Sequence, residues 1–440
     1  MSSPVTKPAD SAAFERNLAH FARPRGPNLL ARTARLSEWV ETRRAANAWP
    51  YFRTLQSAPR PIADVEDFSG RTASGINFGS QDYLGLSTEP SVLDAASSAM
   101  REFGVHSSGS GAVQGGTRIA RELAEGLAEL LEVEHALLFP TGWAAGFGSI
   151  VGLVRHYDYV VMDNLSHACL QQGAYAATQR VLKHDHLDVG SAREQLQEIR
   201  SSDVKGGILV VSEGLFSMDS DTPDIGALQD ACREFDATLL LDVAHDLGEL
   251  GPGGTGALGV QEMLSKVDLV MGSFSKTFAS NGGFLATSSG STLDFVRVYG
   301  GPWTFSNALS PVQAAIVLRA LEIVRSADGE RLRADLLRNV NALRQAFAER
   351  GIECLGSPSA IVPVPVGSEK VGRLACSLIY ERGVHANLVE FPAVPVGDSR
   401  FRMQVMATHH EEQAVQAAEI VASAIAEAKS GFEGSEDGAA

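Results

Sequence analysis

A lysine that follows an apolar run is the residue of this chain best suited to covalent chemistry. Lys276 comes after the apolar stretch 267–272 and before a Gly-rich turn into a second apolar stretch, 281–286. This pattern predicts a lysine in a cleft between two buried strands. Desolvation disfavours the ammonium, so a buried lysine loses its proton readily and can form a Schiff base with an aldehyde cofactor. Taken alone, the pattern fits a lysine in a surface loop at least as well.

An aspartate upstream of this lysine changes that balance. Asp242 ends the apolar run 238–241. A carboxylate at the carboxyl end of a buried strand can pair with a pyridinium nitrogen and keep the ring protonated as an electron sink. By itself, Asp242 also fits a residue that caps the next helix. The spacings Asp242-x-x-His245 and Ser273-x-Ser-Lys276 together predict a pyridoxal phosphate enzyme.

The elements that must position these residues alternate between strand and helix patterns from residue 76 onward. Such alternation is typical of a mostly parallel sheet covered on both faces, in which ligands bind at the carboxyl ends of strands. The expected helices between the strands include 118–132 and 225–235. The expected strands are 136–139, 159–162, 181–183, 207–212, 238–242, 269–273 and 283–287.

The pattern divides the chain into four expected parts. The first has helical spacing over 28–49 after about thirteen small and polar residues expected to be disordered, and the last is rich in Gly, Ser and acidic residues. The third has long amphipathic segments, followed by short strands at 360–365 and 401–405. The parts are an N-terminal arm and helical segment (1–75), a cofactor-binding large domain (76–310), a C-terminal small domain (311–428) and a disordered tail (429–440).

Composition excludes several classes of function. Lys and Arg number 37 against 53 Asp and Glu, a net charge of −16, which argues against nucleic acid and anionic lipid as partners. The four cysteines lack C-x-x-C spacing, so we expect no metal site and no disulfides, as in a reducing cytoplasm. The uncharged run 136–154 is interrupted at Pro140-Thr141-Gly142, so we do not expect it to span a membrane.

Several motifs in order over roughly residues 75 to 425 resemble one family. They are Asn77-Phe-Gly-Ser-Gln-Asp-Tyr-Leu-Gly-Leu-Ser87, the stretch 212–221, the stretches around Asp242 and Lys276, and 391–402. In them the chain resembles the α-oxoamine synthases, which include serine palmitoyltransferase, aminooxononanoate synthase, glycine C-acetyltransferase and aminolevulinate synthase. The resemblance implies an α/β fold of the fold type I aminotransferase kind, with a mostly parallel central sheet, helices on both faces and a smaller C-terminal α+β domain.

The resemblance also implies roles for individual residues. Lys276 would carry pyridoxal phosphate, Asp242 would pair with its ring nitrogen, and His167 would stack on the ring, although a histidine at a helix start fits the local pattern too. The helix start at 141–143 suits a phosphate, although it also fits a simple tight turn. The implied cofactor contacts are Thr141, Gly142, Trp143, His167, Ser217, Asp242, His245, Ser273, Lys276 and Ser306.

Substrate contacts are implied at Gln81, Ser110 and Arg402. A planar guanidinium can hold a carboxylate through two parallel bonds, and Arg402 matches the family arginine that does so by its spacing to His409. Arg400 lies two residues away on the same strand face and is a rival for this role.

The implied reaction is a decarboxylative condensation of a small α-amino acid with an acyl thioester, either acyl-coenzyme A or an acyl carrier protein, to give an α-aminoketone. The stretch 303–311 resembles one that reaches a neighbouring subunit, which implies a homodimer with shared active sites, and the scattered cysteines predict a cytoplasmic protein. The alternatives are another fold type I enzyme, such as an aminotransferase or aldolase, and a regulatory synthase subunit. We expect a regulatory subunit to have lost the lysine.

The chain departs from the family pattern at three positions near the implied substrate site. Gln81 stands where an asparagine is usual, Gly111 where an arginine is usual, and Ala120 where a histidine is usual. A donor carboxylate would lose its cation at residue 111, whereas an apolar chain gains about 0.8 kcal/mol for each buried CH₂. We therefore expect a neutral, medium or long acyl donor, with extra volume opened by Gly111.

Overall fold

The computed structural model of the protein describes residues 13–436. It divides into two compact units, each treated by itself below. The large unit consists of residues 81–217 and 221–334. The small unit consists, in the described chain, of residues 13–80, 218–220 and 335–436.

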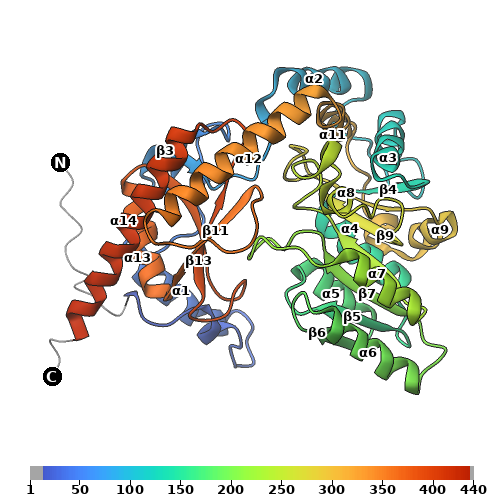
Figure 1. The fold of residues 1–440 in the computed structure, drawn as a ribbon, viewed down its shortest axis with the longest axis horizontal. Helices are drawn as coiled ribbons and strands as arrows, with labels where there is room; N and C mark the ends of the chain where they lie inside the picture. The colour runs from blue at the N-terminus through green and yellow to red at the C-terminus, as the bar shows by residue number, and fades with distance from the viewer. Residues whose placement is uncertain (1–12, 437–440) are drawn as a thin grey trace. The chain divides into compact units, whose positions relative to one another are not determined.

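The large unit is built on a seven-stranded sheet in the order β4-β10-β9-β8-β7-β5-β6 (Figure 1). Strand β10 is antiparallel to both of its neighbours, and the remaining pairs are parallel. All seven strands agree with the sequence prediction to within one residue at either end. They are β4 (His135–Phe139), β5 (Tyr159–Asp163), β6 (Val181–His184), β7 (Ile208–Glu213), β8 (Thr238–Asp242), β9 (Leu269–Ser273) and β10 (Gly283–Thr287).

Helices cover both faces of this sheet, as expected for right-handed crossovers between parallel strands. The connections that leave β4 and β5 run in one direction along the sheet, and those that leave β6 and β7 run in the other. Helices α4 and α5 therefore cover one face of the sheet, and α6 and α7 cover the other (Figure 1). The helices of the large unit are α2 (Pro90–Phe103), α3 (Arg118–Leu131), α4 (Gly142–Leu153), α5 (Ala168–Ala177), α6 (Val189–Ser202), α7 (Ile225–Glu234), α8 (Gly256–Val260), α9 (Gly290–Tyr299), α10 (Gly301–Thr304) and α11 (Pro311–Val324), with short 3₁₀ turns at Leu86–Thr88 and Pro252–Gly254.

Both faces of the central strands are buried, which explains their continuous apolar runs. Every residue of β7 and of β10 is buried. One apolar cluster joins side chains of β4, β5, β7, β8, β9 and β10 to those of α4, α5 and α9. The same runs leave the polar residues at the strand ends, where the candidate site lies.

The small unit contains a six-stranded sheet in the order β1-β2-β3-β12-β13-β11. Its N-terminal strands were not expected, because residues 1–75 were predicted as an arm with helical spacing. Strand β3 pairs in parallel with β12, with Ile76 opposite Val384, so the two ends of the chain share one sheet. The strands are β1 (Thr54–Leu55), β2 (Ile62–Glu66), β3 (Thr72–Phe78), β11 (Ile361–Gly367), β12 (Val384–Val389) and β13 (Ser399–Gln404).

Two predictions at the chain ends, one of a helix and one of a disordered tail, are corrected by the structure. The helix expected over 28–49 is shorter. Helix α14 continues to Glu436, so the tail expected to be disordered from residue 429 is helical over 429–436. The buried ring of Phe432 packs edge-on against Phe14 at 5.5 Å, a long-range contact that extends the helix. The helices of this unit are α1 (Ala34–Ala45), α13 (Glu369–Glu381), α14 (Glu411–Glu436) and the later part of α12 (Ala327–Ala348), with 3₁₀ turns at Leu18–Phe21 and Ala31–Thr33.

The division into units also differs from the expected domain boundaries. Residues 311–334 belong to the large unit, because α11 packs against α2 and α3. The disorder expected at the extreme N-terminus concerns residues 1–12, which lie outside the described residues, as do residues 437–440. No helix within 13–436 combines the length and the apolar character that crossing a bilayer requires.

Candidate active site

The candidate cofactor residues of the large unit lie at the carboxyl ends of its strands. Thr141 follows β4, His167 follows β5, Asp242 ends β8, and Lys276 follows β9. In a parallel α/β sheet this edge is where ligands bind, because the loops that leave it are free to vary. The prediction that these residues share one sheet edge is confirmed.

Lys276 lies in the loop that joins the antiparallel strands β9 and β10. Main-chain bonds close this loop, with Phe274 N–H donating to Gly282 O at 3.0 Å and Ser280 N–H donating to Phe274 O at 3.1 Å. The buried rings of Phe274 and Phe278 meet edge-on at 5.9 Å and anchor the loop. The half-buried lysine is therefore held between two buried strands, as its flanking sequence predicts.

Asp242 is a buried carboxyl group at the end of β8. Its Oδ1 accepts a hydrogen bond from Ala244 N–H at 2.9 Å, and no helix of the described chain begins at this turn, so the helix-cap alternative is not observed. Burial raises the pKa of Asp242, while the positive charges of Lys276 and His167 oppose that rise. A carboxylate that depends on nearby cations for its charge is well suited to a pyridinium nitrogen.

The start of α4 and the end of β9 form the proposed phosphate cradle. Thr141 caps α4, with its Oγ1 accepting from Ala144 N–H at 3.0 Å. A Cβ on Gly142 would lie 2.4 Å from Ser273 Oγ, so glycine is required for this close approach. The first N–H groups of a helix point outward and favour an anion. Together with the Ser273 and Ser275 hydroxyls, which lie 2.8 Å apart, they provide donors suited to a phosphate.

His167 is the N-cap residue of α5 and a neighbour of the proposed phosphate cradle. Its Nδ1 accepts from Cys169 N–H at 3.3 Å and so caps α5. Its ring lies 6.0 Å from that of Trp143, at an interplanar angle of 75°. The helix-start interpretation is therefore correct, and it leaves the ring beside Trp143 at the same sheet edge.

Two further residues near this edge were not predicted from sequence. The hydroxyl of Tyr83 and Nδ1 of His245 share a buried hydrogen bond of 2.9 Å. Glu213, the last residue of β7, accepts a 2.5 Å bond from His167 N–H. A polar residue that ends a buried strand was the signal available for Glu213, and it is the same signal that identified Asp242. Ser217 is buried in the loop that follows β7.

Ser110 and Ser306 lie in two loops of the large unit that contact each other. Ser110 Oγ donates to Thr304 O at 2.6 Å, and a β-bridge joins Ser110 to Asn307. Ser306 Oγ donates to Pro302 O. Gln81 is half-buried at the start of the large unit.

The space next to Gly111 is shared between a side chain and a cavity. A Cβ on this residue would lie 2.8 Å from Cζ2 of Trp303, so the indole occupies the place that a side chain at residue 111 would take. Gly111, Ala120 and Trp303 also line a cavity of about 370 Å³, which agrees with the volume expected there.

The two arginines of β13 differ within the small unit. Arg400 is buried and forms ion pairs with Asp219 and with Asp398, the latter at 3.2 Å. Arg402 is half-buried, and its Nη1 lies 3.8 Å from Met218 Sδ. Since Arg400 is committed to internal carboxylates, Arg402 is the better candidate for a substrate carboxylate.

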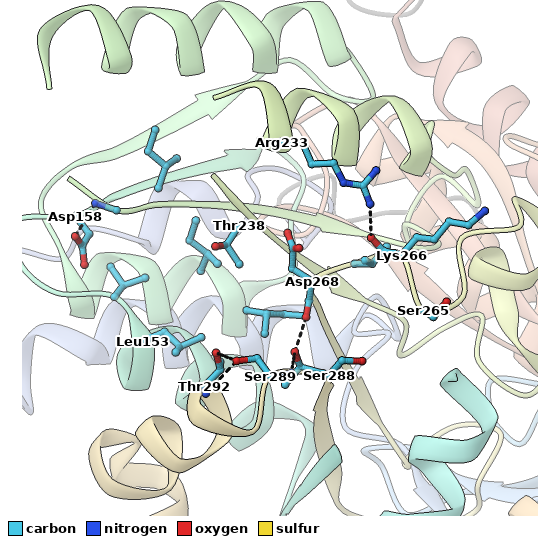
Figure 2. A pocket seen from close by; sticks show the side chains of 17 residues that line it. Leu153, Asp158, Arg233, Thr238, Ser265, Lys266, Asp268, Ser288, Ser289 and Thr292 are labelled. Carbon is cyan, nitrogen blue, oxygen red and sulfur yellow. Dashed lines mark hydrogen bonds between the residues drawn. The ribbon is translucent and has the colours of Figure 1, made fainter. Parts of the chain in front are cut away.

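A cavity of about 710 Å³ lies elsewhere on the large unit, around the amino ends of β7, β8 and β9. Figure 2 shows its lining, which includes Asp268, Arg233 and Thr292. Asp268 Oδ2 accepts from Gln229 Nε2 at 3.0 Å and from Leu239 N–H at 2.9 Å, and Arg233 donates to Lys266 O at 3.1 Å. These polar groups are satisfied by the protein itself, and the cavity lies at the opposite sheet edge from Lys276.

Comparison with known proteins gives consistent matches over most of the chain. The family model for aminotransferase class I and II matches residues 73–421. Serine palmitoyltransferase of Sphingobacterium spiritivorum is 32% identical over 380 residues, 86% of this chain and 92% of that protein. 8-Amino-7-oxononanoate synthase of Geobacter sulfurreducens is 34% identical over 341 residues, 77% of this chain and 86% of that protein.

Solved structures agree with these matches. Serine palmitoyltransferase of Sphingomonas wittichii superposes with a TM-score of 0.84 at 26% identity and covers 91% of this chain and 99% of that one. A high-resolution structure of SPT with PLP has a TM-score of 0.85 at 24% identity, with coverage of 91% and 99%. The predicted fold class is confirmed.

Proposed function

We propose that this chain condenses a small α-amino acid with a neutral acyl thioester. The chain belongs to the aminotransferase class I and II family and, within it, to the α-oxoamine synthases. The products would be carbon dioxide, a free thiol and an α-aminoketone. The chain is an acyltransferase that depends on pyridoxal phosphate. The observation that carries the finer proposal is the indole of Trp303 at Gly111, an apolar surface where relatives are expected to hold a cation.

Residues of the large unit would hold the cofactor. Thr141, Gly142, Trp143 and Ser273 supply donors for its phosphate, and Asp242 supplies the negative charge for its ring nitrogen. His167 would cover the ring, while Ser217 and His245 would contact its O3′ side. Tyr83 holds the His245 ring through Nδ1. Bound pyridoxal phosphate supplies an electron sink for the substrate α-carbon.

Lys276 and Arg402 would act on the amino acid. Lys276 Nζ would be the amine that holds the cofactor aldehyde, and as a free amine it would accept the Cα proton and return it to the product. The Arg402 guanidinium would bind the α-carboxylate. Gln81 would contact the substrate with a side chain one methylene longer than the usual asparagine.

The acyl donor is proposed to be neutral because no cation stands at residue 111. A donor carboxylate brought beside the Trp303 indole would lose hydration without gaining an ion pair, whereas an alkyl chain would bury apolar surface. Ser110 stays a proposed contact on this side of the site, and its hydroxyl is already bonded to Thr304 O.

The experiment compares thioesters. Purified protein loaded with cofactor is incubated with small amino acids and a series of straight-chain acyl-coenzyme A donors, each also supplied on acyl carrier protein, with succinyl-coenzyme A as the charged comparison. Release of thiol and of carbon dioxide is scored together, with Lys276→Ala as the blank. We expect neutral chains to have higher kcat/KM than succinyl. A succinyl donor that outperforms them would contradict the neutral-donor proposal.

The same assay separates the alternatives. An aminotransferase or aldolase would convert the amino acid without releasing thiol. A regulatory subunit would release neither product, even though Lys276 is present.

We also propose a homodimer with shared sites, in which the stretch 303–311 reaches the neighbouring subunit. Mixing inactive Lys276→Ala and Ser306→Ala chains should restore part of the activity, because one site in the mixed dimer would then be intact. An active monomer in sedimentation would contradict this.

A further inference from the structure

Three neighbouring strands of the large unit each end in a carboxyl group. Asp163 ends β5, Glu213 ends β7 and Asp242 ends β8, and the sheet order places β7 between the other two. Glu213 stands directly opposite Asp242 in the parallel register. Their exposed fractions are 0%, 4% and 6%, so the row is buried. No group of His, Cys, Asp and Glu side chains within 13–436 is arranged to hold a metal ion, so a metal does not explain the row.

The outer two carboxyl groups have cationic neighbours. Asp163 Oδ1 lies 2.9 Å from His186 Nδ1 and also accepts from Leu165 N–H at 2.9 Å. Asp242 is attracted by Lys276 and His167. Each of these two carboxyl groups therefore has a basic side chain as a neighbour.

The middle carboxyl group is in a different position. Glu213 accepts the 2.5 Å bond from His167 N–H, and it forms no ion pair with an Arg, Lys or His side chain across the described chain. Burial raises the pKa of Glu213 well above its usual range, the charges of Asp242 and Asp163 raise it further, and the bond from His167 N–H and the charge of Lys276 oppose the rise. Adjacent buried carboxylates cannot all ionise, so the proton goes to the one with the weakest cationic support.

We propose that Glu213 is a positioning residue that stays a neutral carboxylic acid between Asp163 and Asp242 and fixes the main chain of His167. As a neutral acid it leaves Asp242 as the anion that faces the cofactor ring nitrogen. Its Oε1 acceptor sets where α5 begins and so where the His167 ring lies. Glu213 would act through these two residues without itself touching the reacting atoms.

The test uses two variants of the full-length, cofactor-loaded protein. Glu213→Gln reproduces the neutral acid, with an oxygen that still accepts from His167 N–H. Glu213→Leu keeps a similar volume but removes the acceptor. Glu234→Gln, an exposed residue at the end of α7, is the matched control. None of these measurements depends on the acyl donor. A result that contradicts the role of Glu213 can therefore be told apart from a result that contradicts the proposed reaction.

Two readouts are expected. In infrared spectra at pH 7, the carbonyl stretch of protonated carboxylic acids should lose the contribution of one group in Glu213→Gln and be unchanged in Glu234→Gln, while the buried Asp246, whose pKa is raised to about 7 by burial, contributes equally to both. Glu213→Gln should retain its affinity for pyridoxal phosphate within about twofold, whereas Glu213→Leu should bind it about tenfold more weakly, because a buried N–H loses its acceptor.

The proposal is overturned if Glu213→Gln leaves the carbonyl band unchanged, since the residue is then ionised at pH 7. It is also overturned if Glu213→Gln binds cofactor as weakly as Glu213→Leu or fails to fold, because an amide has the shape and acceptor of the neutral acid. If Glu213→Leu binds pyridoxal phosphate with wild-type affinity, the claim that Glu213 fixes the main chain of His167 is overturned.

Discussion

The indole of Trp303 lies against the Cα of Gly111, with Cζ2 2.8 Å from the point where a Cβ of residue 111 would stand. The loop that contains Gly111 and helix α10, which are far apart in sequence, thus fit together only because residue 111 has no side chain. The position that the family resemblance marks as an arginine is occupied here by an apolar ring from another part of the chain.

This contact predicts a dependence between two substitutions. Gly111→Ala should lower the free energy of unfolding by about 1 to 3 kcal/mol, because an added methyl group overpacks the loop against the indole. In a Trp303→Ala background the same change should cost almost nothing. Gly116→Ala in the same loop is the control, since a Cβ there meets no atom within 4 Å. Urea unfolding of the wild type, Gly111→Ala, Trp303→Ala and the double variant measures the coupling between the two positions. Additive effects on the free energy of unfolding would contradict the contact.

Lys276 should be the covalent attachment point of the cofactor. Borohydride reduction of the loaded protein, followed by peptide mapping, should place the label on Lys276. Lys276→Ala should abolish the label, and Lys266→Ala, which changes an exposed lysine, should retain it. Labelled Lys276→Ala protein would refute the assignment.

Asp242→Asn should bind the cofactor but slow exchange of the substrate α-proton with solvent deuterium by about a hundredfold or more. The reason is that a buried charge loses its partner, which costs about 3 to 5 kcal/mol. NMR detection of α-deuteration measures the rate, with Asp230→Asn on the exposed face of α7 as a control. Exchange at the wild-type rate in Asp242→Asn would exclude the proposed role.

The two arginines of β13 should respond differently to substitution. Arg402→Gln should raise the KM for the amino acid by about tenfold or more, because charged hydrogen bonds to the carboxylate are lost. Arg400→Gln should instead lower the free energy of unfolding by about 1 to 3 kcal/mol, because Asp219 loses its partner. Steady-state kinetics and urea unfolding of both variants test this, and a reversed pattern would make Arg400 the substrate ligand.

His186 should make stability depend on alkaline pH. Partial burial disfavours its charged ring, but bonds to Asp163 and Asp221 raise the pKa of His186 to about 10. Because the pKa of His186 is higher in the folded state than in the unfolded state, its charged ring stabilises the fold fully at pH values below the unfolded pKa of about 6.5. This contribution is lost as the pH rises towards 10.

The measurement compares urea unfolding at pH 6 and pH 9. The wild type should lose more stability between these values than His186→Gln. His410→Gln, which changes an exposed histidine, should behave as the wild type. Equal losses in wild type and His186→Gln would show that the ring carries no such proton.

The strands of the large unit and the edge that carries the site could be predicted from local sequence. Continuous apolar runs such as those of β7 and β9 specify buried strands by themselves, and a polar residue at the end of such a run, as at Asp242, must lie at the sheet edge. The place of the Lys276 loop at that edge could be predicted for the same reason, whereas singling out Lys276 also needed its spacing motif together with that of Asp242.

Tertiary structure alone decided the features that depend on pairing between distant residues. The parallel pairing of Ile76 with Val384, the packing of Phe14 on Phe432 and the indole of Trp303 at Gly111 each join segments far apart in the chain. The row of carboxyl groups around Glu213 likewise depends on the strand order. Such contacts leave no periodic signal in the sequence, because each side of the contact is compatible with many partners until the chain folds.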